Sequence, residues 1–215
     1  GTLVATPLNT LVALKDGPIK TLEDLKGKTI GYSVAGFEDA LLAAMLGSVG
    51  MSLDDVTLVN VNFSLSPALL SKQVDAVIGA YRNIELTQLR LEGVEGQAFY
   101  PEEHGVPAYD ELIFVARNDR LSEPAMAAFM RAMEKAVTWQ TNHPEDAIAV
   151  FVEAYPDLDD NLNREAFRET LRRFALRPSA LDTGRYERFG AFMKERGLVK
   201  ETAPVDTFAV ELNQK

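Results

Sequence analysis

The sequence predicts an α/β fold with a largely parallel sheet. Between Lys28 and Tyr100, short apolar segments alternate with segments whose apolar residues recur at helical spacing. Strands that alternate with helices are joined by crossover connections, which favour parallel pairing. The predicted strands are also almost continuously apolar, as expected when helices cover both faces of a sheet.

The elements of the first half are short and closely spaced. Strands are expected at 10–14, 28–34, 55–63, 74–81 and 96–103. Helices are expected at 21–28, 36–50, 66–73 and 83–93. Thr21 is placed to cap the first of these helices and Gly27 to end it, while Gly50 ends the second. Ser66 and Pro67 are typical of the start of a helix.

The second half is predicted to be mostly helical after one further strand at 112–117. The helices are expected at 122–142, 144–155, 163–176 and 184–197, each with an apolar stripe and a charged face. Ser122 is the expected N-cap of the first of them, with Pro124 close to its start.

We expect these elements to form two lobes. The α/β unit at 21–108 is one lobe, and 1–20 together with 109–215 is the other. The strands at 10–14 and 111–116 are the natural crossovers between them. The second lobe has many amphipathic helices but only two clear strands, so we expect it to be incomplete. The chain also opens without Met or a polar lead-in, and we expect a mature, trimmed or incomplete chain.

Composition excludes several classes of function. The 215 residues carry a formal net charge of −10 and a pI of about 4.8, which disfavours binding to nucleic acids or anionic membranes. The absence of cysteine removes disulfides, zinc–thiolate sites and thiol nucleophiles, but it does not decide the redox compartment. No apolar run has the roughly 18 residues that a membrane span needs.

The sequence contains no motif of a known catalytic site. It lacks G-x-S-x-G, the P-loop, H-E-x-x-H and G-x-G-x-x-G, so we expect neither an enzyme nor a cofactor. His104 lies beside Glu102 and Glu103, but this spacing matches no strong metal motif, and we expect no metal site. We expect His143 to have a structural role and Trp139 to lie in the core.

The candidate ligand-binding residues lie where predicted strands end. In an open α/β sheet, ligands bind beyond the carboxyl ends of the strands, next to helix N-termini. Three loops fit this position, with the sequences SVAGFED, NFSLSP and AYRNIE. The residues predicted to contact ligand in the first and third loops are Ser33, Gly36, Phe37, Tyr81, Asn83 and Glu85.

The chemistry of these residues suits a small polar ring. A carboxylate or primary amide, as in Glu85 or Asn83, can read the donor and acceptor edge of an aminopyrimidine, while Tyr81 or Phe37 can stack on the ring. Two structural alternatives stay open: Asn83 caps its helix and Glu85 interacts with the helix dipole, and Gly36 only forms a turn. Tyr109 and Glu111 are further candidates in the predicted crossover loop, where they either contact ligand or satisfy backbone groups.

Several segments resemble one family, the substrate-binding proteins of ABC transporters that capture thiamine-precursor pyrimidines. The segments are DLKGKTIGYSV, DVTLVNVNFSLSPALLSKQVDAVIGAYRNIELTQL, EEHGVPAYDELIFVARND and WQTNHPEDAIAVF. The resemblance implies a two-lobed fold like that of type II periplasmic binding proteins, with ligand enclosed by hinge closure. It also implies an N-terminal segment, absent here, that would complete the lobe formed by 1–20 and 109–215 and add ligand contacts.

The resemblance extends to hydroxymethylpyrimidine phosphate synthases, which share the fold. That branch is expected to use a histidine and a lysine from the N-terminal segment and a cysteine-rich motif, none of which this chain has. The resemblance therefore favours a receptor for a hydroxymethylpyrimidine or formylaminopyrimidine over a synthase-like enzyme or a cytosolic sensor. The implied partner is an ABC permease and the implied location periplasmic or extracellular. Bare sheet edges would allow a homo-oligomer.

Overall fold

The computed structural model describes residues 1–212, which form two compact units. Unit 2 comprises Leu8–Ala108 and Phe189–Lys200. Unit 1 comprises Gly1–Pro7, Tyr109–Arg188 and the residues from Glu201 onward.

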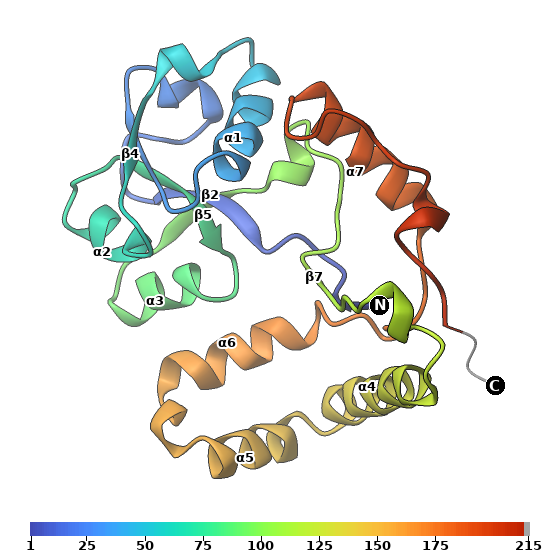
Figure 1. The fold of residues 1–215 in the computed structure, drawn as a ribbon. Helices are drawn as coiled ribbons and strands as arrows, with labels where there is room; N and C mark the ends of the chain where they lie inside the picture. The colour runs from blue at the N-terminus through green and yellow to red at the C-terminus, as the bar shows by residue number, and fades with distance from the viewer. Residues whose placement is uncertain (213–215) are drawn as a thin grey trace. The chain divides into compact units, whose positions relative to one another are not determined.

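Unit 2 is built on a five-stranded sheet with the order β4-β3-β5-β2-β6 (Figure 1). The strands are β2 (Asn9–Leu14), β3 (Thr29–Tyr32), β4 (Thr57–Asn60), β5 (Ala76–Tyr81) and β6 (Gly96–Phe99). The predicted parallel pairing holds where β3 lies between β4 and β5. In contrast, β2 runs antiparallel to both of its neighbours, β5 and β6. The sheet is therefore mixed, with all its carboxyl ends except that of β2 at one edge.

Helices cover both faces of this sheet, as its apolar strands predict. One core packs α1 (Phe37–Gly47) and the 3₁₀ turn η1 (Leu22–Leu25) against alternate strand residues. The other core packs α2 (Leu65–Leu70) against the opposite face, where Leu89 of α3 (Glu85–Leu91) also lies (Figure 1). Short 3₁₀ turns, η2 (Leu53–Asp55) and η3 (Pro101–Glu103), complete the connections.

A bulge in β5 changes which side chains face which core. Thr10 of β2 pairs with Ala80, but the next residue, Leu11, pairs with Ile78, so Gly79 is the extra residue. Gly79 has φ +94°, a conformation that favours glycine. As a result Val77 and Ala80 lie in the same core although they are three positions apart.

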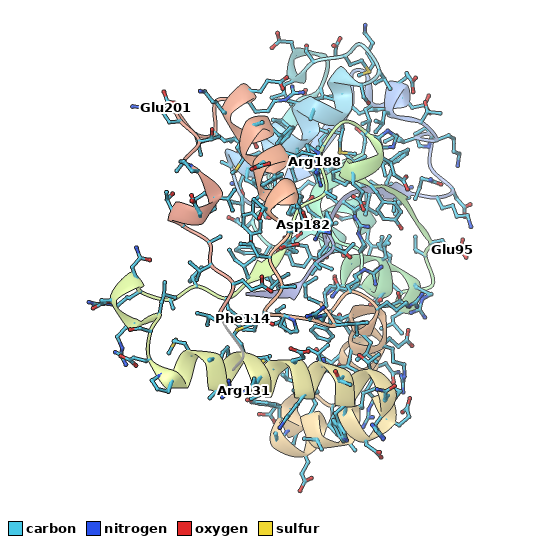
Figure 2. The ribbon with its side chains drawn as sticks, turned by 90° about the vertical axis from the view of Figure 1, so that its right-hand side faces the viewer. Glu95, Phe114, Arg131, Asp182, Arg188 and Glu201 are labelled. Carbon is cyan, nitrogen blue, oxygen red and sulfur yellow. The ribbon has the colours of Figure 1, made fainter. Side chains whose placement is uncertain are left out.

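Unit 1 is mainly helical. Its strands β1 (Thr2–Val4) and β7 (Leu112–Ile113) form a two-stranded antiparallel sheet. Its helices are α4 (Pro124–Asn142), α5 (Pro144–Ala154), α6 (Asn161–Leu171) and the start of α7 (Thr183–Glu195), with 3₁₀ turns at Asn118–Arg120, Pro156–Leu158 and Val205–Thr207. Figure 2 shows Phe114 beside α4. The Phe114 ring meets the ring of Phe129 edge to face, with 5.2 Å between the ring centroids.

The division into units differs from the predicted lobes in two places. We expected 1–20 to stay together, but the boundary lies between Pro7 and Leu8, because β2 is hydrogen bonded in the interior of the five-stranded sheet. The C-terminal end of α7 from Phe189 to Lys200 also belongs to unit 2. The strand predicted at 112–117 is shorter than expected, because only Leu112 and Ile113 pair with β1.

A buried polar cluster joins three segments of unit 1. The Asp110 carboxylate accepts a hydrogen bond from Thr2 Oγ1 at 2.7 Å and forms an ion pair with Arg185. Arg185 Nη1 also donates to Ala5 O at 2.8 Å. Burial and the Asp110 charge raise the pKa of the neighbouring Tyr186. The cluster ties the N-terminal strand, the segment at Asp110 and α7 together.

Candidate functional site

The candidate site lies in unit 2, at the edge of the sheet where β3, β4 and β5 end. Each strand continues into a loop and then into the N-terminus of α1, α2 or α3. Because β2 is antiparallel to β5, its first residue lies at the same edge, and Asn9 pairs with Tyr81. This is the position at which open α/β sheets bind ligands.

Glu38 organises the loop between β3 and α1. The residue is 4% exposed, and its carboxylate accepts hydrogen bonds from Ser33 N at 2.7 Å, Ser33 Oγ at 2.8 Å and Val34 N at 3.1 Å. Gly36 N donates to Asp39 Oδ2 at 3.1 Å, and Gly36 has φ +90°. Glu38 stands in the first turn of α1. In the fold it fixes the backbone of the loop that carries the predicted residues Ser33 and Gly36.

The same carboxylate lies against the bulge of β5. A Cβ atom placed on Gly79 would be 2.3 Å from Glu38 Oε1, so only glycine leaves room for the side chain. Gly79 N donates to Asn9 Oδ1 at 3.3 Å. The bulge, the β3–α1 loop and the start of β2 therefore depend on one another.

A second carboxylate, Glu85, organises the loop between β5 and α3. Its Oε2 accepts a hydrogen bond from Tyr81 N at 2.5 Å. Asn83 is 6% exposed, and its backbone carbonyl oxygen accepts a hydrogen bond from Thr87 Oγ1 at 3.2 Å. Burial raises the pKa of Glu85; bonds from the Tyr81 and Glu85 amides oppose this shift, and the Glu38 charge adds to it.

Replacing Glu85 with glutamine is expected to stabilise unit 2 at neutral and alkaline pH. Because the folded pKa is raised, folding favours the protonated acid, and this favourable contribution is lost as pH rises through the folded pKa. Glutamine keeps an acceptor for Tyr81 N without the buried charge. Urea unfolding should give Glu85→Gln a larger free energy of unfolding than the wild type at pH 8, and this difference should disappear below the ordinary pKa of 4.5. A difference in free energy that is the same at both pH values would contradict this account.

The loop after β4 exposes an aromatic ring. Phe63 is 85% exposed, and Val34 in the neighbouring β3–α1 loop is 46% exposed. Asn62 has φ +50°, and its amide donates to Asn60 Oδ1 at 2.8 Å, which turns the chain sharply after the strand. The sequence prediction named this loop but no residue in it. Phe63 adds an apolar surface to the edge that carries Phe37 and Tyr81.

Arg82 is buried behind the loop between β5 and α3. The side chain of this residue, 8% exposed as a whole, forms two hydrogen bonds with the Glu102 carboxylate, at 2.8 and 2.9 Å. The guanidinium also lies 4.1 Å from the centre of the Tyr100 ring. We did not predict this pair, because nothing in the sequence relates Arg82 to a carboxylate 20 positions away.

Six of the eight predicted residues lie at this edge, on the loops after β3 and β5. The other two, Tyr109 and Glu111, belong to unit 1. Tyr109 is 5% exposed, and Glu111 N donates to Val4 O at 2.9 Å as part of the β1–β7 pairing. The structure does not bring these two together with the six within one unit.

Trp139 is not in the core, contrary to our expectation. It is 42% exposed on α4, and its ring stacks on His143 with 5.6 Å between centroids. His143 Nδ1 lies 3.0 Å from Trp139 O at the end of the helix. The apolar stripe that includes Trp139 is therefore not the stripe that α4 buries through Met130 and Val137.

The edge offers hydrogen-bonding and stacking groups. Two carboxylates hold the loops after β3 and β5. Phe37, Phe63 and Tyr81 lie at or after the ends of β3, β4 and β5. Within residues 1–212, no group of three or more His, Cys, Asp or Glu side chains is arranged to hold a metal ion. No helix in that described part is long and apolar enough to cross a membrane. The arrangement suits a small polar ring.

Comparison with known sequences finds related proteins over most of the chain. A family model described as "NMT1/THI5 like" matches residues 1–147. A putative thiamine biosynthesis protein of Haemophilus influenzae is 50% identical over 213 residues, which cover 99% of this chain and 68% of that protein. The formylaminopyrimidine-binding protein of Halalkalibacterium halodurans is 32% identical over 79% of this chain and 52% of its own length. A 4-amino-5-hydroxymethyl-2-methylpyrimidine phosphate synthase of Legionella pneumophila is 24% identical over 94% of this chain and 64% of its length.

Comparison with solved structures identifies the fold. The periplasmic aliphatic sulphonate-binding protein SsuA of Escherichia coli matches 100% of this chain and 70% of its own, with a TM-score of 0.72 and 15% identity. The alkanesulfonate-binding protein SsuA of Xanthomonas axonopodis pv. citri matches 96% of this chain and 70% of its own, with a TM-score of 0.66 and 16% identity. The predicted fold class, that of type II periplasmic binding proteins, is confirmed.

Proposed function

The chain belongs to the NMT1/THI5-like family, and from this premise we propose that it is a receptor for a thiamine-precursor aminopyrimidine. The ligand is of the hydroxymethylpyrimidine or formylaminopyrimidine type. It binds without being transformed and is delivered to an ABC importer, on the periplasmic or extracellular side of the membrane. The relative whose name states that it binds formylaminopyrimidine supports this ligand class, and the solute-binding fold supports the role.

The observation that carries the proposal is the position of Glu85 just after β5, where its carboxylate accepts a hydrogen bond from Tyr81 N at 2.5 Å, two residues from the buried Asn83. Glu85 is mostly buried, with a raised pKa, and follows β5 at the edge where such sheets bind ligands. An aminopyrimidine presents an amino donor beside an acceptor ring nitrogen. A carboxyl group can accept from the amino group, and in its protonated form it can also donate to the ring nitrogen.

The aromatic residues supply the other requirement of a flat ring. Phe37, Phe63 and Tyr81 each follow a different strand of the edge. Stacking on one of these rings would remove apolar surface from water and orient the pyrimidine toward the carboxyl group.

Titration calorimetry with hydroxymethylpyrimidine and formylaminopyrimidine tests the proposal. We expect binding of at least one of them, and we expect Glu85→Gln or Asn83→Ala to weaken it by about 1–3 kcal/mol, as losing a buried polar contact does. Glu92→Gln is the matched control, since Glu92 is exposed at the other end of α3 and should leave affinity unchanged.

Two results would contradict the proposal. Binding of an aliphatic sulfonate in place of either pyrimidine would assign the protein to another ligand class. Unchanged pyrimidine affinity in both the Glu85 and the Asn83 variants would remove these residues from the site.

A further inference from the structure

Arg82 is a charged residue in a position that normally excludes charge. It follows the buried strand β5 directly and is 8% exposed. Burying a guanidinium is unfavourable unless it is paired and hydrogen bonded. Its role should therefore be visible in the partners that offset this cost.

The partners of Arg82 come from two distant segments of unit 2. Its backbone N–H donates to Leu8 O at 3.0 Å, and Nη2 donates to Asn9 O at 3.3 Å. From the other side, the Glu102 carboxylate accepts from Nη1 at 2.8 Å and from Nη2 at 2.9 Å, and the Tyr100 ring lies under the guanidinium at 4.1 Å. One side chain thus joins the loop after β5 to the start of β2 and to η3.

This arrangement does not leave Arg82 available as an anion-binding residue. The two parallel bonds to Glu102 use the planar fork of the guanidinium, and the carboxylate neutralises its charge. A ligand anion would have to displace Glu102. Arg82 is therefore placed to act through its neighbours in the chain, Tyr81 and Asn83.

Tyr81 is the last residue of β5, and Asn83 lies in the short loop before α3. No side-chain cap bond begins α3, which is only seven residues long. Two local bonds connect this loop to α3, from Tyr81 N to Glu85 and from Thr87 Oγ1 to Asn83 O. Arg82 adds long-range contacts that connect this loop to the start of β2 and to η3.

We propose that Arg82, through Glu102 and Tyr100, is a positioning residue that fixes the loop carrying Tyr81, Asn83 and Glu85 in its ligand-binding arrangement. This inference rests on the proposed function for its effect on affinity. Its effect on the loop is independent of any ligand. Lysine cannot replace Arg82, because an ammonium group offers neither the bidentate fork nor the flat stacking surface.

The first experiment uses the 215-residue protein without ligand. Hydrogen exchange followed by mass spectrometry compares residues 81–87 in the wild type, Arg82→Lys and Glu102→Leu. We expect faster exchange in this loop in both variants. The control Leu46→Ala destabilises unit 2 from the fully buried α1 side without touching the loop. Leu46→Ala should speed exchange across the whole sheet and not selectively at 81–87. General destabilisation of unit 2 can therefore be distinguished from a local effect on the loop.

The second experiment measures the affinity for hydroxymethylpyrimidine and formylaminopyrimidine. A loop that is no longer held in register should bind about ten- to hundredfold more weakly, because small misplacements of binding groups have effects of this size. Arg82→Lys should bind the pyrimidines as weakly as Arg82→Met does. Tyr100→Phe, which keeps the ring, should bind them better than Tyr100→Leu. Arg90→Met, an exposed change on α3, serves as the control.

The two experiments separate the failures. Wild-type protein that binds no pyrimidine would overturn the proposed function, while the exchange data still test Arg82. Exchange at 81–87 that is unchanged in Arg82→Lys and Glu102→Leu would overturn the positioning role. Faster exchange with unchanged pyrimidine affinity would also overturn it, because the loop would then not need to be held.

Discussion

Replacing Gly79 with alanine is expected to destabilise unit 2 by about 3–5 kcal/mol, from two effects that add. At φ +94° an L-residue is strained, which contributes about 1–2 kcal/mol. In addition, the new Cβ would lie 2.3 Å from the Glu38 carboxylate, which must move and lose one of its bonds to Ser33 and Val34. Each lost bond to a buried charged group contributes about 1.5–3 kcal/mol.

Two further variants separate these effects. Gly93 has φ +75° but no atom within 4 Å of the position of a Cβ, so Gly93→Ala should show only the conformational effect. Adding Glu38→Ala to Gly79→Ala removes the collision, so the two changes should be strongly non-additive. Hydrogen exchange of β3 and β5 measures the loss locally. If Gly79→Ala and Gly93→Ala lower the free energy of unfolding by the same amount, the bulge does not depend on Glu38.

Replacing Arg185 with methionine is expected to destabilise unit 1 by about 2–4 kcal/mol, because it leaves a charged group buried without its ionic partner. The Asp110 side chain is 7% exposed and would keep only its bond from Thr2 at 2.7 Å. Ala5 O would also lose its donor. The expected loss is below the full range for buried pairs because the Arg185 side chain is 26% exposed.

The single tryptophan, Trp139 of α4, gives a fluorescence signal for unfolding of unit 1. Urea titration of Arg185→Met should show a lower midpoint than that of the wild type. The matched control is Arg117→Met, whose ion pair with Asp119 has side chains 80% and 60% exposed, and whose loss should fall within experimental error. Equal midpoints for the two variants would show that burial adds nothing to the Arg185–Asp110 pair.

Sequence patterns located the candidate edge because the relevant information is local. A run of apolar residues followed by helical spacing marks the end of β3 and of β5, and parallel strands place these ends together. This reasoning placed Ser33, Tyr81 and Glu85 on two neighbouring loops of unit 2. It did not extend to Tyr109 and Glu111, whose placement depends on how the two halves of the chain are divided.

The same limit explains the groups that were missed. Glu38 looks like an ordinary first-turn acid, and only the bulge at Gly79 shows that its carboxylate turns inward. Arg82 looks like a polar loop residue until Glu102 and Tyr100 are seen to surround it. Trp139 lies at helical spacing, but a helix with apolar residues on more than one side does not reveal which side its neighbours will bury.

The alternation of strands and helices could be predicted from the sequence, because it follows from apolar periodicity and from turn and capping residues close together in the chain. The family and its two-lobed fold were implied by the resemblance of short segments to known binding proteins. Only the tertiary structure decided that β2 enters the sheet antiparallel between β5 and β6, and that Glu38 and Arg82 are buried behind the loops. These features depend on contacts between residues far apart in the chain. Whether a charged side chain is buried is decided by the partners that the fold brings to it.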